Sequence, residues 1–166
     1  MTKETKKENV EKASDKSIKE PTKKSLRKES ANKKDMATLD VKDLPISTKH
    51  SVEICNFLRN KELSNAKNIL SNVIDKKRAI PYKRYNTELA HKAGKIGPGR
   101  YPVKASREIL GLLESIEANA EDVGLDTKSL IINEIRANRG THQLHFGRKR
   151  RRLMKRTHIF MSVKEK

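Results

Sequence analysis

Regularly spaced apolar residues occur only after residue 40, and this limits which part of the chain can form a hydrophobic core. Residues 1–40 contain 12 Lys and Arg and 8 Asp and Glu, with few scattered apolar side chains. Such a segment cannot bury enough apolar surface to offset the entropy lost on folding. We therefore predict a disordered basic tail over residues 1–40, a folded domain over residues 41–163 and a short C-terminal end over residues 164–166.

Three helices are predicted from apolar residues that recur at every third or fourth position. The first starts after Ser47 and the second after Ser64, because serine is a favourable N-cap residue. The third starts near Pro102 and ends at Gly124. The residues expected to face inward are Val52, Cys55 and Leu58 in the first helix, Ala66, Ile69, Leu70, Val73 and Ile74 in the second, and Ala105, Ile109, Leu112, Leu113, Ile116 and Ala120 in the third.

After Asp126 the apolar period changes from helical to alternating, which indicates strands. Residues 130–137 alternate loosely and residues 158–163 alternate cleanly. A further strand over residues 39–46 would complete a three-stranded antiparallel sheet. We predict an α+β fold in which three helices pack on this small sheet. The basic stretch between the last two strands has little to bury, so we expect a protruding β-hairpin extension at about residues 136–163.

The formal net charge of +18 at pH 7 indicates a polyanionic partner. More than half of it, +10, lies in residues 136–166. The sequence has no run of 18 apolar residues and no apolar stretch at its N-terminus of the kind found in signal peptides. We therefore expect a soluble, intracellular protein that binds nucleic acid and has no membrane partner.

Five consecutive cations lie between the two strands of the predicted hairpin, and they repel one another strongly unless phosphates neutralise them. They are Arg148, Lys149, Arg150, Arg151 and Arg152. A solvated charge run or a nuclear-localisation signal is the alternative interpretation. Because a strand on either side fixes this run to a folded base, we favour an RNA-binding arm.

The segment from residue 76 to residue 101 interleaves basic residues with all three tyrosines of the chain. Aromatic rings beside cations suit stacking on unpaired bases and contact with phosphates. The alternative, equally open for each ring, is that the tyrosines cover the sheet or the helix ends. The residues of this segment are Lys76, Lys77, Arg78, Lys83, Arg84, Lys92, Lys95 and Arg100, with Tyr82, Tyr85 and Tyr101.

No pattern predicts catalysis, a cofactor or a metal ion. The glycines of residues 94–99 do not have the spacing of a nucleotide-binding loop. His142, His145 and His158 lack a Cys or carboxylate partner other than Glu165, so RNA contact or exposure is favoured over metal binding. The single cysteine, Cys55, is interpreted as a core residue. Every Asp and Glu is expected in the tail or on a helix surface, so no small-molecule substrate is predicted.

Five stretches resemble the universal large-subunit ribosomal protein twenty-two family in its archaeal and eukaryotic form, whose eukaryotic member is numbered seventeen. They are residues 43–47, 73–82, 99–105, 117–121 and 157–159. The resemblance implies a structural constituent of the large ribosomal subunit in the cytoplasm, near the peptide exit. Its partners would be large-subunit ribosomal RNA, neighbouring ribosomal proteins and the nascent polypeptide. In this family the long hairpin threads between RNA domains and lines the exit tunnel.

The resemblance also implies roles for individual residues. Combined with the charge pattern, it gives an expected RNA-binding set of Lys76, Lys77, Arg78, Lys83, Arg84, Lys92, Arg100, Lys104, Arg148, Lys149, Arg150, Arg151, Arg152, Lys155, Arg156 and His158. Gly147 and Arg148 resemble the Gly-Arg pair near the family's hairpin tip and would line the tunnel. A general nucleic-acid-binding architectural protein and a ribosome assembly factor are the alternative functions.

Three departures from the family bear on this assignment. Residues 1–40 align with no part of it. Thr48 stands where the family usually has proline. The hairpin is shorter by about five residues, or about 17 Å of strand. If the ascending arm is the shorter one, the tip lies at Gly147 and Arg148, and the arms run back through Leu144 and Leu153 to Ala137 and Ile159. If the returning arm is shorter, Met154 or Lys155 lies nearest the tip.

Overall fold

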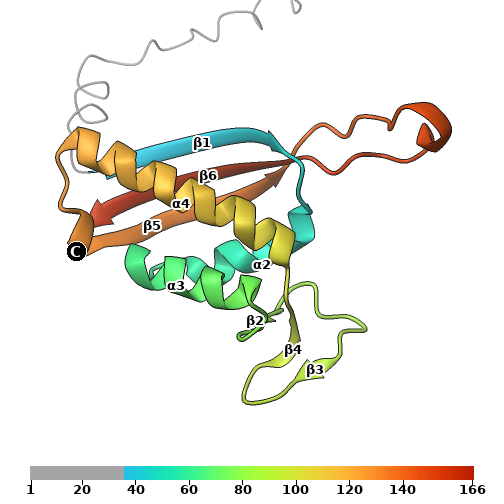
Figure 1. The fold of residues 1–166 in the computed structure, drawn as a ribbon, viewed down its shortest axis with the longest axis horizontal. Coiled ribbons are helices and arrows are strands. Elements are labelled where there is room, and N and C mark those ends of the chain that lie inside the picture. Colours follow the sequence, from blue (N-terminus) through green and yellow to red (C-terminus); the bar gives the residue numbers. More distant parts are fainter. Residues whose placement is uncertain (1–35) are drawn as a thin grey trace, which may run out of the picture. The chain divides into compact units, whose positions relative to one another are not determined.

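The central sheet is antiparallel and has the strand order β1-β6-β5 (Figure 1). The computed structural model describes residues 36–166. Strand β6 (Thr157–Glu165) pairs on one side with β1 (Met36–Leu44) and on the other with β5 (Leu130–Arg139). Alternate residues of β6 face the core, and Ile159, Met161 and Val163 are all buried. The clean alternation of this last strand therefore predicted the correct inward face.

Three helices cover one face of this sheet, as predicted (Figure 1). They are α2 (Thr48–Leu58), α3 (Leu63–Ile74) and α4 (Val103–Val123). Helix α4 packs along β1 and α3, while α2 packs against β5. The largest fully buried side chains come from all of these elements and include Ile54, Leu58, Leu70, Ile109, Leu113, Ile116, Ile132, Ile135 and Ile159. The α+β fold class is confirmed.

The helix ends agree with the sequence in one case and differ in another. Helix α4 ends at Gly124, whose φ of 87° is the left-handed conformation that glycine adopts without steric cost. The N-cap of helix α3 is Glu62, two residues before the predicted cap Ser64, which lies exposed inside the helix. On α2, Val52 is only partly buried and Ile54 is fully buried, so the inward face is rotated from the predicted one.

A second small sheet lies within residues 76–101, for which the sequence indicated no regular element. It has the order β2-β4-β3, formed by β2 (Ile80–Pro81), β3 (His91–Lys92) and β4 (Gly97–Arg100). Strands of two to four residues rich in glycine and proline carry no readable period. At Gly99 an added Cβ would lie 3.1 Å from the backbone oxygen of Ile80, so the close approach of β4 to β2 favours glycine.

The predicted boundary of the tail was wrong, because β1 begins at Met36. Residues 36–40 pair with β6, and Ala37 is buried. Five residues are too few for their alternation to stand out beside a charged segment. The rest of the predicted tail lies outside the described residues. At the other end, β6 continues to Glu165, beyond the predicted limit of the domain at residue 163. No helix within residues 36–166 has the length and apolar character needed to cross a membrane.

Truncation tests whether the folded domain starts at residue 41, as predicted from the sequence, or at Met36, where β1 begins. A chain that lacks residues 1–40 is expected to melt roughly 5–10 °C below a chain that lacks residues 1–35, because the longer deletion removes half of β1 and the buried side chain of Ala37. Thermal unfolding followed by circular dichroism measures the difference. Equal melting temperatures would mean that the first half of β1 does not contribute to the stability of the sheet.

Candidate nucleic-acid interface

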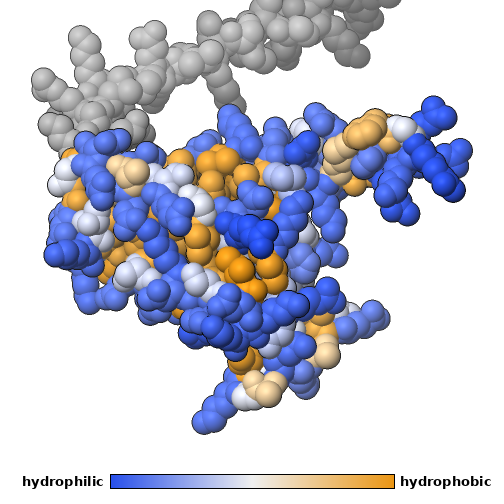
Figure 2. Space-filling view, viewed as in Figure 1, coloured by the Kyte–Doolittle hydropathy of each residue, from blue (hydrophilic) through white to orange (hydrophobic). Residues whose placement is uncertain are grey.

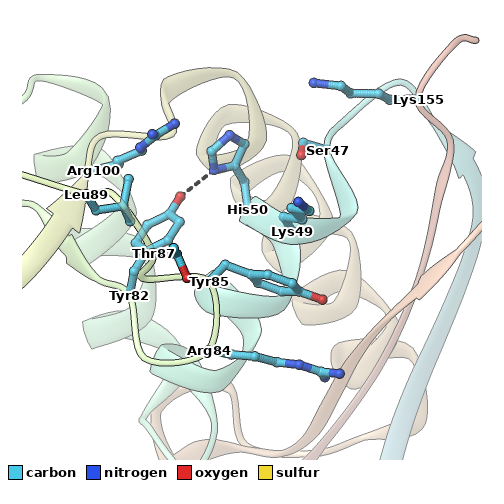
Figure 3. Close-up of a pocket in the computed structure, with 10 residues that line it drawn as sticks. All are labelled: Ser47, Lys49, His50, Tyr82, Arg84, Tyr85, Thr87, Leu89, Arg100 and Lys155. Atoms are coloured by element: carbon cyan, nitrogen blue, oxygen red, sulfur yellow. Dashed lines mark hydrogen bonds between the residues drawn. The ribbon is translucent and has the colours of Figure 1, made fainter.

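A pocket of about 330 Å³ brings together cations from four separate segments (Figure 3). Lys49 comes from α2, Arg84 from the segment after β2, Arg100 from the end of β4 and Lys155 from the segment before β6. No Asp or Glu is among the described residues that line it. The pocket is therefore a concentration of positive charge suited to an anion such as a phosphate.

Tyr85 holds two of these cations near its ring. The Lys49 Nζ atom lies 5.7 Å and the Arg84 guanidinium carbon 5.5 Å from the ring centroid. These are cation–π distances, and Figure 3 shows the two side chains on either side of the ring. The contacts reduce the number of conformations open to the two long side chains, so that less entropy is lost when they bind an anion.

His50 and Tyr82 form a neutral wall of the pocket. The His50 Nδ1 atom and the Tyr82 hydroxyl are hydrogen-bonded, and the rings meet edge to face at 5.8 Å (Figure 3). Burial, followed by the charges of Arg100 and Lys155, lowers the pKa of His50 below its usual 6.5. Burial also raises the pKa of Tyr82 to about 12. Both groups are uncharged at neutral pH, and the charge of the pocket comes from Lys and Arg alone.

Glu53 fixes the loop that carries Arg84 and Tyr85. Its side chain on α2 is 1% exposed, and its carboxylate accepts backbone N–H bonds from Lys83 at 3.1 Å, Arg84 at 2.8 Å and Tyr85 at 2.7 Å. A buried carboxylate is stable where several donors of this kind satisfy it. The expectation that every acidic residue lies in the tail or on a helix surface was therefore wrong for Glu53.

Residues 140–156, here called the arm, extend beyond the ends of β5 and β6 (Figure 1). Three backbone hydrogen bonds connect its two sides: Gly140 N–H to Arg156 O at 2.9 Å, Met154 N–H to Gln143 O at 2.7 Å, and His145 N–H to Arg152 O at 2.8 Å. Leu144 pairs with Leu153, and at the base Ala137 pairs with Ile159. These are the pairs expected if the turn lies at Gly147 and Arg148.

The end of the arm carries charge that no acid balances. Residues 148–152 are all exposed, and they surround a hollow of about 550 Å³. Within residues 36–166, no ion pair involves any of the five. Figure 2 shows the end of the arm as strongly hydrophilic, with a more hydrophobic area beside it. Mutual repulsion of these cations is relieved only by an anionic partner or by counterions.

Three other predicted RNA-binding residues do not line the pocket. Lys104 lines a neighbouring hollow together with His50 and Lys155. Lys83 has an exposed side chain and belongs to the loop that Glu53 holds. Lys92 lies in β3, with its Nζ atom 5.5 Å from the centroid of the Tyr101 ring. The two hollows share His50 and Lys155, so they form one continuous basic surface between the starts of α2 and α4.

The remaining predicted residues lie elsewhere. Lys76, Lys77 and Arg78 are exposed after the end of α3, with Lys77 paired to Asp75 and Arg78 over the ring of Phe57. At the base of the arm, Asp43 engages two more. The Arg156 guanidinium donates to the backbone oxygen of Asp43 at 3.2 Å, and the backbone N–H of Asp43 donates to His158 Nδ1 at 3.0 Å. Arg156 and His158 thus form hydrogen bonds with Asp43 of β1, within the protein.

Sequence reasoning missed Lys49 and His50. A signal existed for Lys49, because it lies in the first turn of α2, where a cation is unfavourable beside the positive end of the helix dipole. Lys104 occupies the same position in α4, and neither helix has an acidic residue in its first turn. Cations in the first turn of a helix favour the interpretation that an anion binds at that helix start. No signal in the sequence indicated Glu53, whose partners come from a different segment.

The candidate metal histidines have other partners. His142 accepts a hydrogen bond from Arg139 at 3.3 Å, and His158 accepts one from the backbone of Asp43. No group of three or more His, Cys, Asp and Glu among the described residues is arranged to hold a metal ion. Cys55 is buried, and burial raises the pKa of its thiol to about 12, so it is a core residue as expected.

Replacing Glu53 by Gln is expected to lower the free energy of unfolding by about 2–4 kcal/mol, because one amide oxygen cannot satisfy three N–H donors and the amide brings a donor of its own. Urea unfolding measures the change. The matched control is Glu121→Gln on the exposed side of α4, expected to change stability by less than about 0.5 kcal/mol. Equal effects of the two substitutions would contradict the anchoring role of Glu53.

Comparison with known proteins gives one consistent result. Residues 39–164 match the family described as ribosomal protein L22p/L17e. The large ribosomal subunit protein uL22 of Methanoculleus marisnigri is 47% identical over 107 residues, 63% of this chain and 70% of that protein. For the uL22 of Archaeoglobus fulgidus the identity is 45% over 100 residues, 59% and 64% of the two chains. The uL22 of Staphylothermus marinus is 41% identical over 133 residues, which cover 74% of this chain and 85% of that protein. The matches thus cover between 64 and 85% of the lengths of these relatives.

Proposed function

Because the chain belongs to the ribosomal protein L22p/L17e family, we propose that it is a structural constituent of the large ribosomal subunit that binds large-subunit ribosomal RNA and aids its assembly. The family is structural and non-enzymatic, and its uL22 members are components of the cytoplasmic large subunit. Neighbouring ribosomal proteins are the further partners that this membership implies.

One observation supports RNA binding most directly: the arm carries five unbalanced cations at its end, residues 148–152, and contributes one cation, Lys155, to the pocket near its base. A nucleic-acid backbone bound along the arm would meet positive charge at both ends. Neutralising these phosphates releases counterions, which favours binding most strongly at low salt.

We also propose that the arm is the β-hairpin that reaches the exit tunnel, with Gly147 and Arg148 nearest the nascent polypeptide. The turn at residues 147–149 and the backbone bonds between the two sides of the arm support this. From Gly140 to Arg148 an extended chain spans about 27 Å. An arm of that length carries the turn well away from the sheet.

Salt dependence tests the binding of RNA phosphates by the arm. The triple substitution R148S/R150S/R152S is expected to reduce the slope of log affinity against log salt by about 0.7–0.9 for each phosphate that the arm no longer neutralises. Filter binding to a large-subunit ribosomal RNA transcript between low and moderate salt measures this slope. The matched control is K128S/K164S/K166S, three exposed lysines at the opposite end of β5 and β6. If both triple variants change the slope equally, the arm has no special role in binding phosphate.

Crosslinking tests the tunnel contact. In a C55A background, Arg148→Cys within assembled particles is expected to crosslink to a stalled nascent chain, because Arg148 lies in the turn. Lys166→Cys, at the far end of the sheet, is the control and should not react with the chain. Reaction from Met154→Cys or Lys155→Cys in place of Arg148→Cys would move the tip into the returning side of the arm. No reaction from any of these positions would refute tunnel lining.

A further inference from the structure

The end of the arm carries exposed apolar side chains that the binding of an RNA backbone does not explain. Phe146 is 78% exposed, Leu144 64% and Leu153 58%. In the part of the chain that the structure describes, only Val123 joins them as an exposed large hydrophobic residue. Isolated apolar residues on a surface are ordinary, but three on one short arm form a patch that needs a partner.

Phe146 differs from the other two phenylalanines of the chain. Phe57 lies under Lys61 and Arg78, and Phe160 lies under Arg136 at 4.9 Å. Phe146 instead stacks on the neighbouring His145 imidazole, with ring centroids 4.8 Å apart and an interplanar angle of 26°. With one face on His145 and 78% of the residue exposed, the ring offers a free aromatic surface.

The backbone fixes this pair of rings at the start of the turn. The His145 N–H donates to Arg152 O at 2.8 Å, and His145 Nδ1 lies 2.9 Å from the backbone oxygen of Phe146. Gly147 follows with a φ of 62°, a conformation that turns the chain sharply after the ring. Phe146 is therefore held directly beside the unpaired cations of residues 148–152.

We propose that Phe146, backed by His145, is a stacking platform for one unpaired base of RNA, with the phosphates on either side of that base bound by the cations of residues 148–152. The proposal rests on the RNA-binding function proposed above and adds its ligand class at the tip. Base stacking on an aromatic ring beside a basic track is how proteins bind unpaired nucleotides.

Two other occupants fit the patch less well. A duplex keeps its bases stacked inside the helix, so a side chain on a broad basic turn cannot reach a base face. An apolar protein segment would cover the ring only by removing water from adjacent cations that have no acidic partner among the described residues, and such desolvation opposes binding. An unpaired nucleotide satisfies both the ring and the charges.

Fluorescence gives a direct test, because the chain contains no tryptophan. In the full chain, Phe146→Trp supplies a single indole whose emission is expected to be quenched when a base stacks on it. The probes are an unstructured single-stranded RNA and the same strand in a duplex. Quenching by the single strand alone supports the platform. Equal quenching by both, or quenching by neither, overturns it.

Affinity for the single strand gives a second test. Phe146→Ala is expected to weaken binding by roughly 5- to 150-fold, the range for removal of one stacked base, while Phe146→Tyr keeps the affinity. Leu144→Ala removes another exposed apolar side chain of the arm, one without a π face, and should change affinity less than about twofold. An equal weakening by both alanine variants would indicate an apolar contact in place of stacking.

The salt slope separates this proposal from the function on which it rests. Phe146→Ala should leave the slope unchanged, because stacking releases no counterions. If R148S/R150S/R152S lowers the slope while Phe146→Ala has no effect on affinity, the arm binds phosphate and the stacking proposal alone fails. If neither variant has an effect, the RNA-binding function of the arm fails with it.

Discussion

Strand β6 is hydrogen-bonded on both sides, and the sheet and the arm both depend on this pairing. Its residues face β1 on one edge and β5 on the other over nearly its whole length. The inward side chains Ile159, Met161 and Val163 give the three helices a continuous apolar surface. The pairing of β6 with β5 also brings residues 139 and 157 together, so the arm starts from two strands already in register. The arm needs no core of its own.

The basic surface depends in a similar way on contacts within the fold. Glu53 alone holds the backbone of three consecutive loop residues, and this loop supplies Arg84 and Tyr85 to the pocket. A buried carboxylate with good donors is stable, whereas the loop without it would leave three N–H groups unpaired. One buried acidic residue therefore fixes the loop that supplies one cation of the pocket, Arg84, so the stability of the fold and the arrangement of the pocket are linked through it.

The sequence predicted the elements whose signal is local and repeated. Helix α4 shows a long apolar period and a glycine stop, and β6 alternates cleanly, so both were found with nearly correct ends. The strands β2, β3 and β4 are too short to show a period. The pocket was missed for another reason. Its cations come from residues 49, 84, 100 and 155, and only the tertiary fold brings them together. The predicted cations Arg84, Arg100 and Lys155 are members, but no spacing in the chain groups them.

Positive charge on this protein is placed where it destabilises the free chain. Lys49 and Lys104 lie at the positive ends of two helices, and the arm gathers five cations without an acid among its described neighbours. A chain selected for stability alone would place acids at such positions. If phosphates bind this surface as we propose, they would offset these unfavourable terms, and the same charges that weaken the free protein would strengthen the complex. His50 and Tyr82 add nothing to the positive charge of this surface, because both are neutral in the pocket wall. The free energy that the cations cost in the free protein would thus be recovered in the proposed complex with an anionic surface, and this favours the bound state over the free one.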